Sequence, residues 1–99
     1  MSVKATKSPD GAVVTIQISG RFAFSLYKSF REAQELSETA SRYVIDLSQC
    51  TYVDSSALGM LGMLKKKVGE NVEVEIIKVS PEIRELLDMV KDQLALIVH

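Results

Sequence analysis

Asp54, Ser55 and Ser56 form a polar triplet between two apolar segments, one that ends at Val53 and one that begins at Ala57. Side-chain oxygens at such a junction can serve three purposes. They can cap a helix by accepting hydrogen bonds from its first N–H groups, a serine can attack a substrate as a nucleophile, or a serine can accept a phosphate. One cap is enough for one helix, so capping accounts for only one of the three residues.

A nucleophilic serine requires a general base and an oxyanion-binding site. The only histidine is His99, the last residue of the sequence, where we expect the chain to fray. Neither a Gly-x-Ser-x-Gly elbow nor a Gly-rich phosphate-binding loop occurs. The single cysteine, Cys50, excludes an internal disulfide and a cysteine-based metal site, and we expect it to lie in the core. We therefore predict that the protein is not an enzyme and uses no cofactor or metal.

A phosphate on Ser55 would lie at the N-terminus of a helix, where unpaired N–H groups and the helix dipole favour negative charge. It would add about two negative charges and hardly disturb the fold. The same charge could prevent a partner from docking, because an unpaired charge in an interface costs about 2–5 kcal/mol, or about 30-fold or more in affinity. One hydroxyl group could therefore switch binding.

The helix that follows the triplet has two different sides. At about 100° per residue, the side predicted to face the core consists of Ala57, Leu61, Leu64 and Val68, flanked by Leu58 and Met60. The opposite side carries Gly59, Gly62, Met63 and Lys66. A glycine weakens a helix by about 1 kcal/mol relative to alanine and leaves its surface flat, and Met63 adds an adaptable apolar contact. This side is either a docking surface for another protein or a place of close packing within the domain.

The segments before the triplet indicate a hairpin and a helix. Residues 12–19 alternate apolar and polar side chains, and the turn sequence of residues 8–11 joins them to a short strand over 3–7. Gly20 is predicted to end the second strand. Apolar residues at spacings of three and four then predict a helix over 24–39.

Strands and helices continue to alternate downstream. Gly69 is a suitable helix end, and Ser80 with Pro81 is a suitable helix start. The remaining predicted elements are a strand over 43–48, a helix over 55–68, a strand over 72–79, a helix over 81–90 and a closing strand over 95–98.

The predicted order β-β-α-β-α-β-α-β is that of an α/β protein with a mixed, mostly parallel sheet packed against helices. A length of 99 residues fits a single domain over 1–99. Ligands and partner proteins tend to bind such sheets at the carboxyl ends of the strands, and the triplet at Asp54 follows one of these ends. Asp46, a polar residue within a central strand, is a candidate support for the loop at Asp54.

The composition is 46% hydrophobic and 25% charged, as in ordinary globular proteins, and the formal net charge of -1 argues against nucleic-acid binding. The longest apolar run, 57–64, is too short to cross a membrane, and the N-terminal residues contain no apolar signal segment. We therefore expect a cytoplasmic protein with no membrane insertion. Lys65, Lys66 and Lys67 complement the dipole at the end of their helix.

The segment VIDLSQCTYVDSSALGMLGMLKKK, residues 44–67, resembles the signature of STAS domains, most closely that of the bacterial anti-sigma factor antagonists. Those proteins carry Asp-Ser-Ser or Asp-Ser-Thr after a strand, followed by Gly or Ala, Leu and Gly. The segments TIQISGRFAFS, 15–25, and VEIIKVSPEIRELLDMV, 74–90, are similar to the family's early strand and its late strand and helix. The resemblance therefore covers nearly the whole chain and implies a STAS-like fold.

The resemblance implies that Ser55 is phosphorylated by a serine kinase of the histidine-kinase-like ATPase fold, which is often the anti-sigma factor itself. The unphosphorylated form would bind the anti-sigma factor and release the sigma factor, and a serine phosphatase would reset the switch. Asp54 and Ser56 would neighbour the phosphorylation site, and Ser56 is a second candidate for the modification. The residues implied to bind the partner, on or near the docking helix, are Ala57, Gly59, Gly62, Met63 and Lys66.

Ala23 departs from the family pattern, because many members carry an acidic residue after the triplet that corresponds to Gly20-Arg21-Phe22. This substitution bears on the kinase step, whereas binding could survive it. The segment GRFAFS also resembles a subgroup that works with response regulators carrying phosphatase or kinase domains. Two alternatives remain open at this point: a nucleotide-binding module, and a STAS subunit of a lipid-transport or other signalling complex.

Overall fold

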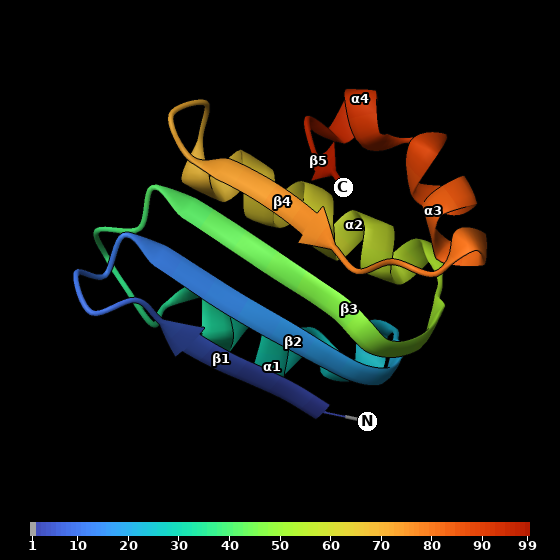
Figure 1. Cartoon of the computed structure of the whole chain (residues 1–99), viewed down its shortest axis with the longest axis horizontal. Coiled ribbons are helices and arrows are strands. Elements are labelled where there is room, and N and C mark those ends of the chain that lie inside the picture. Colours follow the sequence, from blue (N-terminus) through green and yellow to red (C-terminus); the bar gives the residue numbers. More distant parts are fainter. Residues whose placement is uncertain (1) are drawn as a thin grey trace.

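The computed structural model describes residues 2–99, which form one five-stranded sheet and its flanking helices. The strands are β1 (Ser2–Lys7), β2 (Val13–Phe22), β3 (Arg42–Val53), β4 (Glu73–Ile77) and β5 (Ile97–Val98). The helices are the 3-10 helix η1 (Phe24–Leu26), α1 (Tyr27–Gln34), α2 (Ser55–Val68), α3 (Pro81–Asp88) and α4 (Lys91–Leu94). The strands lie in the order β1-β2-β3-β4-β5, with β1 antiparallel to β2 and the other pairs parallel (Figure 1). The predicted fold class and the alternation of elements are confirmed.

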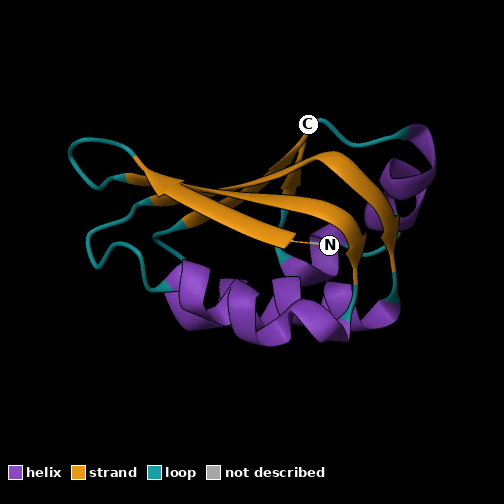
Figure 2. Ribbon diagram, turned by 90° about the horizontal axis from the view of Figure 1, so that it is seen from below, coloured by secondary structure: helices purple, strands orange, loops and turns teal. Residues whose placement is uncertain are grey.

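The core lies between one face of the sheet and helices α1 and α2, which cover that face side by side (Figure 2). Alternate residues of β2, β3 and β4 point into it because side chains along a strand alternate between faces. The fully buried members from the strands include Val14, Ile16, Ile18, Ile45, Val74 and Ile76, and those from α2 include Ala57, Leu61 and Leu64. Burying such side chains supplies most of the stability of a domain of this size.

The end of β2 differs from the prediction, because Gly20 does not end the strand. Gly20 pairs with Cys50 of β3, and a register shift follows between Gly20 and Arg21. Its φ of 80° suits glycine, which tolerates positive φ without steric cost. Gly20 therefore forms an irregularity that bends the strand, as β-bulges do. Strands β2 and β3 continue to Phe22 and Val53, and both ends curve in Figure 1.

Four other elements are shorter than predicted, and one of them is the closing strand expected over 95–98, which spans only Ile97–Val98 in the structure. The helix expected over 24–39 begins as η1 and ends at Gln34. The chain then turns, and Ser37 donates a 2.6 Å hydrogen bond to the carbonyl oxygen of Gly11. Strand β4 ends at Ile77, before Lys78 with its positive φ of 58°. The helix expected over 81–90 ends at Asp88, and the short α4 follows it.

His99 is not frayed as expected. Its backbone N–H donates to the carbonyl oxygen of Ile76 at 2.9 Å, and its Nε2 lies 2.7 Å from Oε1 of Glu75. These contacts hold the segment after β5 against β4.

Within residues 2–99, none of the helices is both long enough and apolar enough to span a membrane.

Candidate functional site

Helix α2 begins directly after Asp54, and Asp54 is its cap. The Asp54 backbone is extended, and its Oδ1 accepts a hydrogen bond from the N–H of Ala57 at 3.0 Å. This is the standard N-cap arrangement, in which a side chain satisfies an N–H of the first turn. The cap therefore comes from the carboxylate, which leaves Ser55 exposed and Ser56 half-buried at the first two positions of the helix.

The start of α2 is joined to the end of β2. The Asp54 N–H donates to the carbonyl oxygen of Phe22 at 3.4 Å, so Ala23 lies beside the start of α2. This places the position that is often acidic in the family next to the Asp54-Ser55 segment. The methyl group of Ala23 brings no charge there.

The outer side of α2 is open at Gly59. A side chain added at Gly59 would meet no atom within 4 Å in residues 2–99, so internal packing does not explain this glycine. Met63, one turn further on, is 57% exposed, and Lys66 is exposed as well. These three residues make up what we call the outer strip of α2, which is flat at one end, apolar in the middle and cationic at the other end.

Gly62 has a different explanation. A Cβ atom added there would lie 3.0 Å from Cδ2 of Leu94, so the missing side chain lets α4 pack closely against α2. Close internal packing, the alternative left open for both glycines, therefore holds for Gly62 and not for Gly59.

Two sequence predictions for this region are corrected. Ala57 was placed among the partner-binding residues, but it lies on the core-facing side of α2, is completely buried, and its side chain cannot touch a partner. Asp46 does not support the Asp54 loop: its Oδ1 accepts from the N–H of Ser48 at 2.8 Å, and its Oδ2 lies 3.9 Å from Nζ of Lys78. The Asp46 side chain therefore contacts β3 and Lys78 and not the Asp54 loop.

Two further predictions agree with the structure. Lys65 donates hydrogen bonds from Nζ to the carbonyl oxygens of Gly69 and Val72, at 3.1 and 2.7 Å, so it binds the end of α2 as a dipole-complementing cation should. Cys50 is buried, and burial raises the pKa of its thiol, with hydrogen bonding to the backbone opposing that shift. A buried thiol with a raised pKa is unreactive and belongs to the core.

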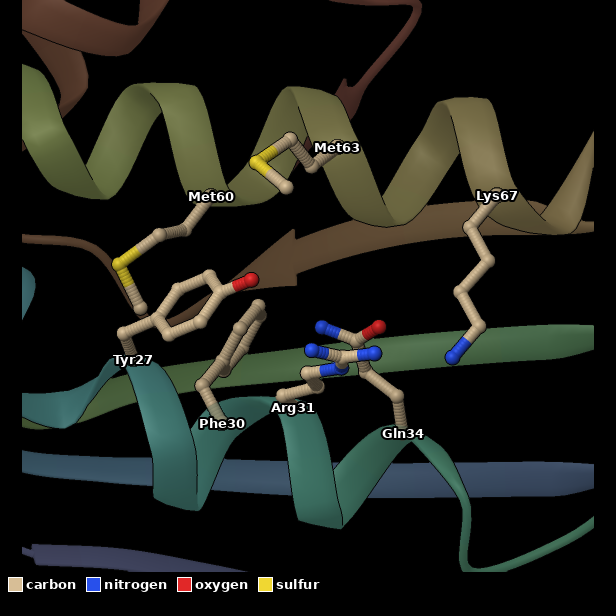
Figure 3. A pocket seen from close by; sticks show the side chains of 7 residues that line it. All are labelled: Tyr27, Phe30, Arg31, Gln34, Met60, Met63 and Lys67. Carbon is tan, nitrogen blue, oxygen red and sulfur yellow. The ribbon is translucent and has the colours of Figure 1, made fainter.

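Sequence reasoning missed the contribution of η1 and α1. Phe24 is 66% exposed and stacks on Tyr27, with ring centroids 5.5 Å apart. Tyr27 in turn lines a pocket between α1 and α2, which also includes Met63 (Figure 3). The available signal was that Phe24 falls outside the buried stripe of Leu26, Phe30 and Ala33. The sequence contains no such signal for the pocket, because the pocket forms only when α1 and α2 pack side by side.

The family follows from comparison with known sequences. Residues 5–91 match the family model described as "Mlab, STAS domain". The chain belongs to the STAS domain family. A STAS-domain containing protein of Pseudomonas aeruginosa (strain UCBPP-PA14) is 47% identical over 89 residues, which cover 88% of each chain.

Solved structures share this STAS fold. An anti-sigma factor antagonist from Mycobacterium paratuberculosis superposes with a TM-score of 0.76 at 17% identity, over 99% of this chain and 86% of the other. The anti-sigma factor antagonist SpoIIAA in its unphosphorylated form gives 0.69 at 15% identity, over 99% and 87%. The STAS domain of an antisigma-factor antagonist from Rhodobacter sphaeroides gives 0.62 at 28% identity, over 78% and 85%. The chain is therefore a STAS domain similar to anti-sigma factor antagonists.

The geometry of this STAS domain fits a regulatory site on its surface. An exposed hydroxyl group stands at the positive end of α2, the outer strip begins one turn away, and a stacked aromatic pair follows on the neighbouring η1 and α1. The side chain of Ser55 is exposed to solvent, and it precedes Gly59 of the outer strip by one helical turn.

Proposed function

We propose that this STAS domain is an anti-sigma factor antagonist controlled by phosphorylation of Ser55. In its unphosphorylated form it binds an anti-sigma factor and thereby releases a sigma factor. The observation that carries the proposal is the exposed hydroxyl of Ser55 beside a helix cap that Asp54 already provides. Stability therefore does not require a hydroxyl at this position.

The physical basis of the switch is local electrostatics. The N-terminus of α2 can accept a phosphate without distortion, because unpaired N–H groups and the helix dipole favour negative charge there. A partner that docks on the outer strip would then face about two additional negative charges. If they stay unpaired in the interface, they weaken binding by about 2–5 kcal/mol.

Ser55 is preferred over Ser56 as the acceptor because it is exposed and Ser56 is half-buried. The proposed modifying enzymes are a serine kinase of the histidine-kinase-like ATPase fold and a serine phosphatase, with a response regulator as a candidate carrier of either activity. The similarity to solved anti-sigma factor antagonists supports this assignment.

The test compares four versions of the full chain as baits in extracts of the native cell: wild type, Ser55→Ala, Ser55→Glu and the control Ser29→Glu. Ser29 is an exposed serine on α1, so the control makes the same charge change on a different helix. Captured proteins are identified by mass spectrometry, and Ser55 phosphorylation is measured in the same samples.

We expect an anti-sigma factor or kinase-fold protein on all baits except Ser55→Glu. Equal capture by all four baits, together with unmodified Ser55, would contradict the switch and make Ser55 an ordinary surface residue. Capture of a transporter ATPase instead would assign the domain to a transport complex.

A further inference from the structure

A pocket of about 230 Å³ lies between α1 and α2, on the surface that contains Met63 of the outer strip. Figure 3 shows side chains from the two helices pointing toward one another across it. Its lining residues are Tyr27, Phe30, Arg31 and Gln34 of α1 and Met60, Met63 and Lys67 of α2.

The lining divides into an apolar part and a cationic part. Tyr27 and the exposed Met63 supply a ring and a thioether at the surface, next to Phe30 and Met60, which are buried, and methionines can adapt their shape to an inserted group. Arg31 and Lys67 bring two positive charges, and Gln34 adds an amide. In Figure 3, Met60 and Tyr27 lie toward one end of the pocket, and Gln34 and Lys67 toward the other.

Among the residues that the structure describes, neither cation has a carboxylate partner. No carboxylate is among the residues that line the pocket. Within residues 2–99, ion pairs form at Arg42, Lys78 and Lys91, and none forms at Arg31 or Lys67. In a chain with a formal net charge of -1, this makes the pocket a local positive site that complements a carboxylate.

The size of the pocket favours one inserted side chain. Small-molecule sites typically enclose roughly 300–1,000 Å³, which is more than this pocket offers. Protein interfaces, in contrast, are often anchored by a single large apolar side chain that fills a pocket of the partner. The exposed Phe24, stacked on Tyr27, extends the apolar surface beyond the pocket.

We propose that this pocket anchors an acidic segment of a partner protein. A large apolar side chain of the segment fills the space between Tyr27, Met60 and Met63, and a neighbouring aspartate or glutamate binds Arg31 and Lys67. The proposal rests on the function proposed above for the outer strip of α2, which shares Met63 with the pocket, and it defines the chemistry of the partner segment.

The probe is a random peptide library displayed on phage and selected on the full-length chain. Peptides are selected in parallel on wild type, on the charge-reversed Arg31→Glu/Lys67→Glu variant and on a Lys4→Glu/Lys7→Glu control. The control reverses two exposed lysines of β1 and so matches the change in net charge. Thermal unfolding of each variant verifies that it is folded.

We expect wild type and control to enrich peptides that place an aromatic residue, leucine or methionine beside an aspartate or glutamate. Dissociation constants of these peptides should rise about tenfold or more on the charge-reversed variant. That variant should instead select peptides with lysine or arginine beside the apolar residue. Enrichment of peptides without the acidic pattern, equal affinity for the charge-reversed variant, or no enrichment over a blank surface would each overturn the proposal.

Two further measurements identify other occupants. If a second copy of the chain occupied the pocket, sedimentation of the chain alone would reveal a dimer that dissociates in the charge-reversed variant. If the pocket held a small amphipathic anion, octanoate would raise the melting temperature of wild type but not of that variant. Either result would overturn the proposal. The outcome is separable from the Ser55 switch, because failure of the peptide selection leaves the four-bait comparison intact, and the reverse also holds.

Discussion

Helices α2 and α3 both begin with a side-chain N-cap. Only α2 has, directly after its cap, an exposed polar residue that takes no part in capping. In α3, Ser80 accepts a hydrogen bond from the N–H of Ile83 at 3.3 Å, and Pro81 occupies the first position of the helix. Ser80 and Pro81 therefore both stabilise the start of α3. In α2, Asp54 is the cap, and the exposed Ser55 that follows it adds nothing to capping.

The outer sides of the two helices differ in the same way. The exposed residues of α3 include Glu82, Glu85 and Asp88, as expected for a solvated surface. Those of α2 include Gly59, which weakens the helix, and Met63, which exposes apolar surface. Where residues reduce stability without an internal partner, function is the better explanation. This contrast supports the proposal that the outer side of α2, rather than that of α3, binds a partner.

The largest expected effect distinguishes the two sides of α2. Leu61→Ala should lower the free energy of unfolding by about 2–5 kcal/mol, because Leu61 is completely buried and its loss leaves a cavity. Met63→Ala should change it by no more than about 0.5 kcal/mol, since the side chain is mostly exposed. Urea unfolding measures both. A comparable loss in the two variants would place Met63 in the core and remove it from the outer strip.

The next effect compares the same acidic substitution at two helix starts. Ser55→Glu should weaken binding of the captured partner by about 30-fold or more. Pro81→Glu, at the first position of α3, should leave that affinity unchanged because α3 is outside the proposed interface. Isothermal titration calorimetry measures both affinities. If Pro81→Glu weakens binding as strongly as Ser55→Glu, the two helix starts are not functionally different.

A smaller effect tests the caps themselves. Asp54→Ala and Ser80→Ala should each lower the free energy of unfolding by about 1 kcal/mol, and Asp54→Asn should retain most of it because asparagine also caps. Thermal or urea unfolding provides the measurement. A neutral Asp54→Ala variant would show that one of the serines caps α2 in its place.

The smallest effect separates the two glycines. Gly59→Ala should raise the free energy of unfolding by about 0.8–1 kcal/mol, because the added methyl group meets open space and alanine favours the helix. Gly62→Ala should gain less, since the same methyl group lies 3.0 Å from Cδ2 of Leu94. Equal gains would mean that Leu94 moves away readily and that α4 does not require a glycine opposite it.

Features encoded by adjacent residues could be predicted from the sequence. The bounds of α2 agree with the prediction because Asp54 and Gly69, which define its two ends, act locally. Gly20 was misjudged because a glycine that bends a strand and one that ends it look alike until the partner strand is known. The segment after α1 is tied by the bond between Ser37 and Gly11, which are distant in sequence, so the predicted continuation of the helix to residue 39 could not be corrected from local pattern.

The same distinction applies to the candidate site. The exposed positions of Ser55, Gly59 and Met63 could be predicted because these residues lie on one helix with a regular period. Arg31 and Lys67 could not, since they come together only when α1 packs beside α2. The charge of the pocket is therefore a property of tertiary structure rather than of any one segment.

The most direct test of the central claim uses the phosphate itself. The chain is prepared with phosphoserine incorporated at position 55, and its affinity for the captured partner is compared with that of the unmodified chain by calorimetry. We predict that the phosphorylated chain binds about 30-fold or more weakly while its melting temperature stays within a few degrees of the unmodified value. Equal affinity of the two forms would contradict the account, because phosphorylation of Ser55 would then not control binding.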